Sequence, residues 1–171
     1  MTVVELLAYE LKICFIHIDR LKLALKKTEH LYPFTEEIIR HIPEEDLVYL
    51  ELLTVRLGKL QDTLGEKVFS LILEALGESM ENKSFIDKLN KLEKLEILPS
   101  AQWWQDLRKL RNILVHEYPD NPAFIADNLN TAFIQTKRLL VFWESLAAYI
   151  KMNHLDPRIG VRGKQEETFV L

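Results

Sequence analysis

The sequence has few of the residues that break helices or cross-link a chain. Among its 171 residues are one cysteine, five glycines and six prolines. The single cysteine, Cys14, excludes an intrachain disulfide. It lies among apolar neighbours, and we interpret it as a small core residue. Because glycine and proline are scarce while leucine, lysine and glutamate are abundant, the composition favours helix over strand.

Long apolar runs and an excess of positive charge are also missing. The longest apolar runs are much shorter than the roughly 18 residues that a membrane-spanning helix needs. Glu5 and Glu10 interrupt the apolar start of the chain, which predicts no signal peptide. We therefore expect a cytoplasmic protein with no membrane partner. The formal net charge of −4 argues against a generic nucleic-acid binder, since affinity for phosphate comes from cationic patches, but it leaves room for a local basic site.

Apolar residues recur at helical spacing along most of the chain. Thr2 and Glu5 fit a capping box at the start of a first helix that reaches about Lys27. A connection over residues 30–41 follows, with a helical turn in its second half. The further predicted helices cover residues 84–95, residues 100–118, and a last stretch from Asn121 and Pro122 to about Met152.

Between Pro43 and about Ser79 lies another apolar periodic stretch. Gly58 and Gly65 fall inside it, so the pattern is compatible with one long helix or with two. Gly77 is a plausible stop. The sequence therefore predicts an all-α protein: an antiparallel up-and-down bundle of four to six helices in a single domain over residues 1–155. We expect residues 156–171 to form a flexible C-terminal tail.

The run RNILVHEYPD at residues 111–120 is the most informative feature of the chain. It places Arg111, Asn112, His116 and Tyr118 in one stretch that is typical of a helix end, because Pro119 cannot continue a helix. Cleaving RNA without a metal requires a base, an acid and a group that stabilises the charged phosphorane. Histidine can transfer protons near neutral pH, and arginine binds phosphate with a forked set of donors.

The spacing within this run suggests how the residues cooperate. Asn112 and His116 are four residues apart, so on a helix they share a face, and Asn112 is able to orient the imidazole or donate to phosphate. Arg111 lies about 140° from His116 around an ideal helix. A two-fold dimer with facing motifs would supply two arginines and two histidines to one cleft. Arg108 and Lys109, beside the motif, are candidate RNA contacts.

Other readings of the same residues stay open. Arg111 can be a surface arginine that pairs with a carboxylate, and His116 can be a helix C-terminal cap without chemistry. Trp104 lies on the strip that leads to Arg111, and we interpret it as a dimer contact, with a base-stacking surface as the alternative. Asp62 and its neighbour Gln61 are able to reach toward the cleft. The remaining histidines have no spacing that indicates a metal site, and no cofactor is predicted.

The motif carries a resemblance to a known family. The Arg111-to-His116 spacing resembles the R-x4-H motif of HEPN-domain proteins, including the polar residue after the arginine, here Asn112. With Tyr118 it resembles the longer R-x4-H-x-Y form of the HepT-like toxins. The sequence-level likeness covers about eight residues, with a vaguer likeness at residues 56–67, and the helical plan extends it to most of the chain.

The resemblance implies a function. HEPN domains pair so that their motifs line a cleft between two copies, and many are metal-independent endoribonucleases. It implies RNA as substrate, a homodimer, and a toxin neutralised by a partner nucleotidyltransferase (MNT) that adds AMP to the motif tyrosine, here Tyr118. Tyr118 can otherwise position RNA. The alternative is a non-catalytic helical subunit that binds a nucleotide or partner beside a nucleotidyltransferase. A purely structural bundle, in which the motif is accidental, is the third possibility.

Overall fold

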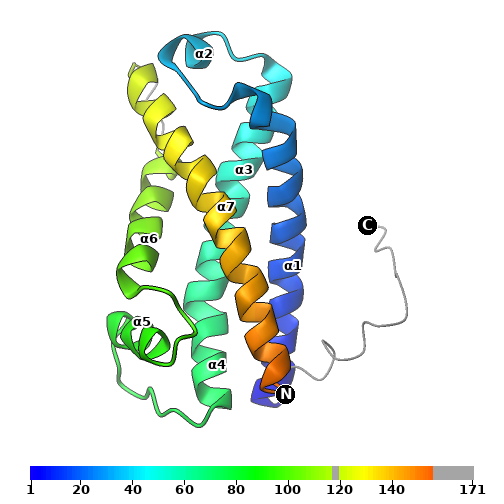
Figure 1. Ribbon diagram of the computed structural model, residues 1–171, viewed down its shortest axis with the longest axis vertical. Helices are drawn as coiled ribbons and strands as arrows, with labels where there is room; N and C mark the ends of the chain where they lie inside the picture. The colour runs from blue at the N-terminus through cyan, green and yellow to red at the C-terminus, as the bar shows by residue number, and fades with distance from the viewer. Residues whose placement is uncertain (117–119, 156–171) are drawn as a thin grey trace, which may run out of the picture.

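In the computed structural model, which describes residues 1–116 and 120–155, the chain is a bundle of antiparallel helices (Figure 1). α1 (Val3–Thr28) runs up the bundle, α3 (Glu44–Asp62) with α4 (Phe69–Ala75) runs down, α6 (Ala101–Val115) runs up and α7 (Pro122–Met152) runs down. The described ranges contain no strand. The predicted all-α, up-and-down bundle is therefore confirmed.

Three shorter elements connect the long helices. A 3-10 turn, η1 (Glu29–Leu31), and the short helix α2 (Glu36–Arg40) join α1 to α3 at one end of the bundle. α5 (Phe85–Lys94) lies between α4 and α6 near the other end (Figure 1). None of the described helices is both long enough and apolar enough to cross a membrane.

Side-chain caps set the helix starts where the sequence predicts them. The Thr2 hydroxyl accepts a hydrogen bond from the Glu5 backbone N–H, and the Glu5 carboxylate accepts from the Thr2 N–H in return. At the start of α7, the Asn121 side chain accepts from the Phe124 N–H at 3.1 Å. Each of these bonds satisfies a backbone donor that has no partner within its helix. The predicted boundaries at residues 2 and 121 are confirmed.

Gly77 ends the α4 helix as expected. Its φ of 76° is in the left-handed region, where glycine has no steric penalty. The N–H groups of Glu78 and Gly77 donate to the carbonyls of Leu73 and Glu74, both at 2.9 Å. These two bonds form a Schellman motif, which satisfies carbonyls that the helix leaves without partners.

The stretch from Glu44 to Ala75 is one continuous helical segment rather than two helices. Its middle, η2 (Thr63–Val68), is a π-helix. The backbone stays in the right-handed helical conformation where η2 joins α3, at Asp62, and where it joins α4, at Val68. Helices insert π-turns where a local fit requires an extra residue. Here the segment packs against α1 and α6, and Gly65 within it lies against the Trp104 indole.

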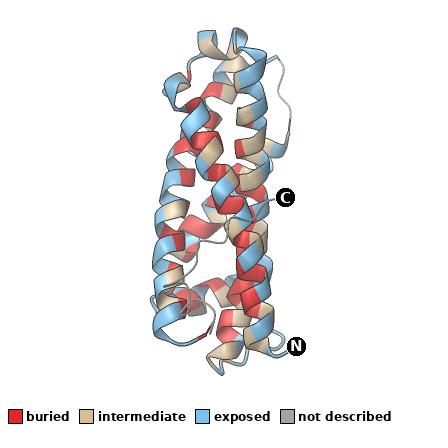
Figure 2. Ribbon diagram, turned by 90° about the vertical axis from the view of Figure 1, so that its right-hand side faces the viewer, coloured by how far each residue is buried: buried red, intermediate tan, exposed pale blue. Residues whose placement is uncertain are grey.

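Apolar side chains fill the centre of the bundle, as the buried residues along every long helix show (Figure 2). Trp104 is fully buried, with its ring centroid 4.6 Å from that of Phe69 and 6.0 Å from that of Phe142. The prediction that Trp104 forms a dimer contact or a base-stacking surface is therefore wrong. Helical periodicity alone placed Trp104 on a strip beside the core stripe, and η2, whose Gly65 lies against the indole, buries Trp104 at the start of that strip.

The close packing at Gly65 leads to a stability prediction. A Cβ atom at Gly65 would lie 3.1 Å from Trp104 Nε1 and 3.5 Å from Phe85 Cζ. The indole is fully buried and has little room to move. We therefore expect overpacking in the Gly65→Ala variant to lower its free energy of unfolding by about 1–3 kcal/mol. The loss should exceed the gain of about 1 kcal/mol that alanine brings to a helix. Urea denaturation of the purified variant measures the difference.

Gly58→Ala is the matched control. A Cβ atom there would lie 3.4 Å from Arg111 Cγ, an ordinary contact distance. This variant should match the wild type or exceed it by up to about 1 kcal/mol. Equal stabilisation of Gly65→Ala and Gly58→Ala would mean that η2 accommodates a side chain at residue 65 and that Trp104 does not pack closely against it.

Candidate functional site

α6 ends earlier than the sequence predicts. The expected boundary was residue 118, whereas the last helical residue is Val115 and His116 is the C-cap, with an extended backbone (ψ 141°). The His116 N–H still donates to the Ile113 carbonyl at 3.2 Å. The proline rule restricts only the residue directly before Pro119, and the reversal from α6 to α7 already begins at His116. His116 is consequently exposed and no longer shares a regular helical face with Asn112.

Arg111 lies between α6 and α3. Its Cγ atom packs over Gly58 of α3. Its Nη2 donates to the Asp62 carboxylate at 2.5 Å, and both side chains are 35% exposed. The alternative prediction, that Arg111 pairs with a carboxylate, therefore matches the contact seen within this chain. Asp62 was among the residues expected to reach toward the motif, and it does so.

Asn112 contacts the arginine rather than the histidine. Its Oδ1 accepts a hydrogen bond from Arg111 Nη1 at 3.0 Å. With Asp62 on Nη2, each terminal nitrogen of the guanidinium has one partner and retains a further N–H. The arrangement orients the guanidinium and leaves donors for an anion.

The Arg111 side chain points back along α6. α3 runs down the bundle and α6 runs up (Figure 1). The Arg111 side chain passes Gly58 and reaches Asp62, one turn further down α3, so the guanidinium is directed toward the start of α6, as long side chains on a helix usually are. His116 follows the opposite end of this helix, where it is exposed.

The neighbouring basic residues lie on the exposed side of α6. The Arg108 guanidinium lies over the Phe85 ring, 4.5 Å from its centroid. Lys109 Nζ is 3.7 Å from the Asp106 carboxylate one turn earlier. Both side chains remain exposed, as an RNA contact requires. A phosphate would have to compete with the Phe85 ring for Arg108 and with the Asp106 carboxylate for Lys109. Tyr118, predicted to position RNA or accept AMP, lies outside the described residues, as does the predicted tail.

Two polar pairs cross from α1 to the α3 segment, away from α6. Arg56 Nη1 donates to His17 Nδ1 at 3.1 Å, and Lys67 Nζ donates to the Glu10 carboxylate at 3.1 Å. Burial lowers the pKa of His17, and the positive charges of Arg56 and Lys59 lower it further. The imidazole is therefore neutral at pH 7 and occupied by Arg56, which is the environment of a structural histidine.

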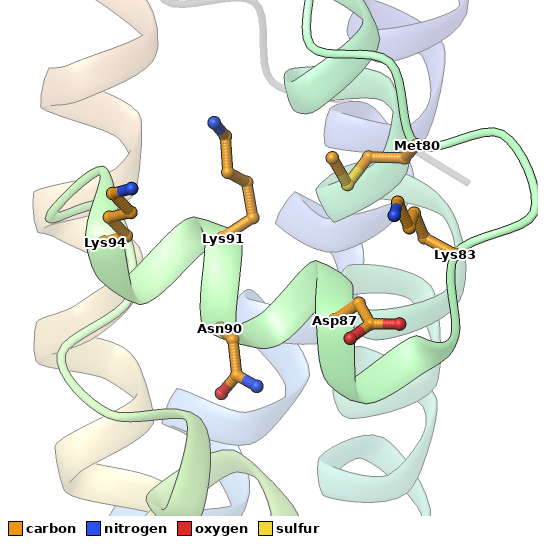
Figure 3. Close-up of a pocket in the computed structure, with 6 residues that line it drawn as sticks. All are labelled: Met80, Lys83, Asp87, Asn90, Lys91 and Lys94. Carbon is orange, nitrogen blue, oxygen red and sulfur yellow. The ribbon is translucent and has the colours of Figure 1, made fainter.

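A depression of about 250 Å³ lies along α5 and the loop before it (Figure 3). Its lining is rich in lysine, and Lys91 within it is already paired with Glu78 at 2.8 Å. None of its lining residues belongs to α6, so it is separate from the motif. Within residues 1–116 and 120–155, no three histidine, cysteine or acidic side chains are grouped closely enough to hold a metal ion. The depression is lined by Met80, Lys83, Asp87, Asn90, Lys91 and Lys94.

The fold and the site together define an all-α helical bundle with an exposed arginine–asparagine–histidine cluster at the end of one helix. Comparison of the chain with protein-family models, with curated proteins and with solved structures finds no match.

Proposed function

We propose that this protein is a metal-independent endoribonuclease of the HEPN type that acts as a homodimer. The observation that carries the proposal is the state of Arg111 in its motif. It is a one-third exposed guanidinium that is held by Asn112 and paired with Asp62, with N–H donors left for a phosphate. The exposed imidazole of His116 on the same helix end supplies the group that transfers protons.

The roles follow from the chemistry of each side chain. Arg111 binds the scissile phosphate and stabilises the charged phosphorane, as a preorganised cation does. His116 takes the proton from the ribose 2′-hydroxyl or gives one to the leaving 5′-oxygen. Asn112 holds Arg111 through its Oδ1. Arg108 and Lys109 contact the RNA backbone on either side.

A dimer would supply both groups to one phosphate. Because the Arg111 guanidinium points back toward the start of α6 and His116 follows its end, a phosphate between two facing α6 helices would meet the arginine of one copy and the histidine of the other. The proposal includes a toxin role, with a nucleotidyltransferase antitoxin that adds AMP to Tyr118. It also places the protein in the cytoplasm, where its RNA substrate is.

Purified protein incubated with total RNA in EDTA tests the nuclease. We expect cleavage that persists in EDTA, and Arg111→Ala should reduce it at least about 100-fold, the scale on which one transition-state donor acts. Circular dichroism and thermal unfolding show whether the variant is folded. No cleavage by folded, dimeric, unmodified wild type would contradict the proposal.

A second function is favoured by one observation. Arg111 is already paired with Asp62, and its guanidinium points back along α6, as in a site that binds an anion without reacting. The protein would then be a nucleotide- or partner-binding subunit that accompanies a nucleotidyltransferase. Nucleotide binding that requires Arg111, together with the absence of cleavage, would support this function over the nuclease.

A further inference from the structure

Asp62 receives the Arg111 guanidinium across two helices. The arginine stem lies over Gly58, and Asp62, four residues later on α3, accepts from Nη2. Asp62 is the last residue of α3 before the π-helix η2, and η2 packs against Trp104 of α6 at Gly65. The pair therefore joins the same two helix segments that meet at Gly65.

This contact occupies part of the group that would bind phosphate. Asp62 accepts from Nη2 of Arg111, one of the two terminal nitrogens of the guanidinium. While the pair is intact, the carboxylate also places a negative charge directly beside the atoms that would bind phosphate.

We propose that Asp62 is an autoinhibitory counter-ion, which occupies the Arg111 guanidinium until a nucleic-acid phosphate displaces it. This inference rests on the proposed function, because it deepens the role given there to Arg111. The pair suits displacement: both side chains are one-third exposed, and a single carboxylate oxygen receives the guanidinium. Exposed pairs of this kind are weak enough for a competing anion to break.

Binding of a nucleic acid that cannot be cleaved tests the inference directly. A fluorescent DNA ten-mer has no 2′-hydroxyl, and its anisotropy at fixed low salt reports affinity alone. We expect Asp62→Asn to tighten binding about five-fold, the upper range for an exposed pair. Asp62→Ala, which cannot accept a hydrogen bond from Arg111, should tighten it at least as much. Both variants alter a one-third exposed side chain and should remain folded.

Two controls separate release of Arg111 from a general change of charge. Glu66→Gln removes the same charge one turn further along, from an exposed side chain, and should change affinity less than two-fold. In an Arg111→Ala background, Asp62→Asn should no longer tighten binding, because the two residues act as one unit. Equal tightening by Glu66→Gln, or tightening that survives without Arg111, would overturn the inference.

The cleavage assay distinguishes this inference from the proposed nuclease. If wild type cleaves RNA, Asp62→Asn should lower KM and leave kcat unchanged or raised. A lower kcat with unchanged DNA affinity would instead make Asp62 a positioning residue for Arg111 and overturn autoinhibition, while the nuclease stands. If no variant cleaves RNA but Asp62→Asn tightens DNA binding through Arg111, the nuclease fails and the counter-ion role stands.

Discussion

Replacing His116 by alanine should lower RNA cleavage by at least about 100-fold, because a positioned general acid or base contributes about 10²–10⁴-fold to such a reaction. The fold should not change. His116 is exposed, and its backbone bond to Ile113 does not depend on the side chain. Single-turnover cleavage of a short RNA, beside thermal unfolding of the same samples, measures both quantities.

His41 offers a matched control for this variant. It is also an exposed helix C-cap, and its N–H also donates to the carbonyl three residues earlier at 3.2 Å. His41→Ala should keep full activity. Cleavage by His116→Ala at the wild-type rate would show that the imidazole has no part in the reaction, and equal losses in both variants would point to a general effect of removing a histidine.

The largest effect on stability is expected at Trp104. Trp104→Ala removes a fully buried indole that packs against Phe69, Trp103 and Phe142. We expect a loss of about 3–5 kcal/mol in the free energy of unfolding, the range for a large aromatic replaced by alanine in a core. Urea denaturation measures it. A dimer that dissociates without loss of monomer stability would instead restore the interpretation of Trp104 as an interface residue.

Trp104→Phe tests how the indole is accommodated. The Trp104 Nε1–H is buried and has no hydrogen-bond partner among the described residues, and such a donor costs about 1–3 kcal/mol. Phenylalanine keeps an aromatic ring and removes that donor, so its destabilisation should be well below that of alanine. Similar losses in both variants would indicate that the indole nitrogen has a partner such as water.

The fold was predictable because its signals are local. Caps at Thr2 and Asn121 and the glycine stop at Gly77 act through hydrogen bonds within a few residues, and each lies where the sequence places it. The helix boundary at residue 118 was wrong by three residues. It was inferred from Pro119, whose constraint reaches only one residue back, whereas the reversal into α7 starts at His116.

The sequence predicted which residues belong to the candidate site better than it predicted how they are arranged in space. Arg111, Asn112 and His116 are adjacent in sequence, so a spacing pattern finds them together. The partner that sets the direction of Arg111 is Asp62, 49 residues earlier. The sequence marked Asp62 only as a residue able to reach the motif, because no local rule relates a side chain on α3 to one on α6.

The sequence by itself determined that the chain is helical, where most helices begin and end, and which exposed residues form the motif, since periodicity, capping and composition act over short distances. Only the tertiary structure decided that Trp104 is core and that Arg111 is held by Asp62. Both depend on how α6 lies against the α3 segment, where the π-helix and two glycines lie at the contact between the helices. Helix contacts of this kind are set by packing across the bundle rather than by neighbours in the chain.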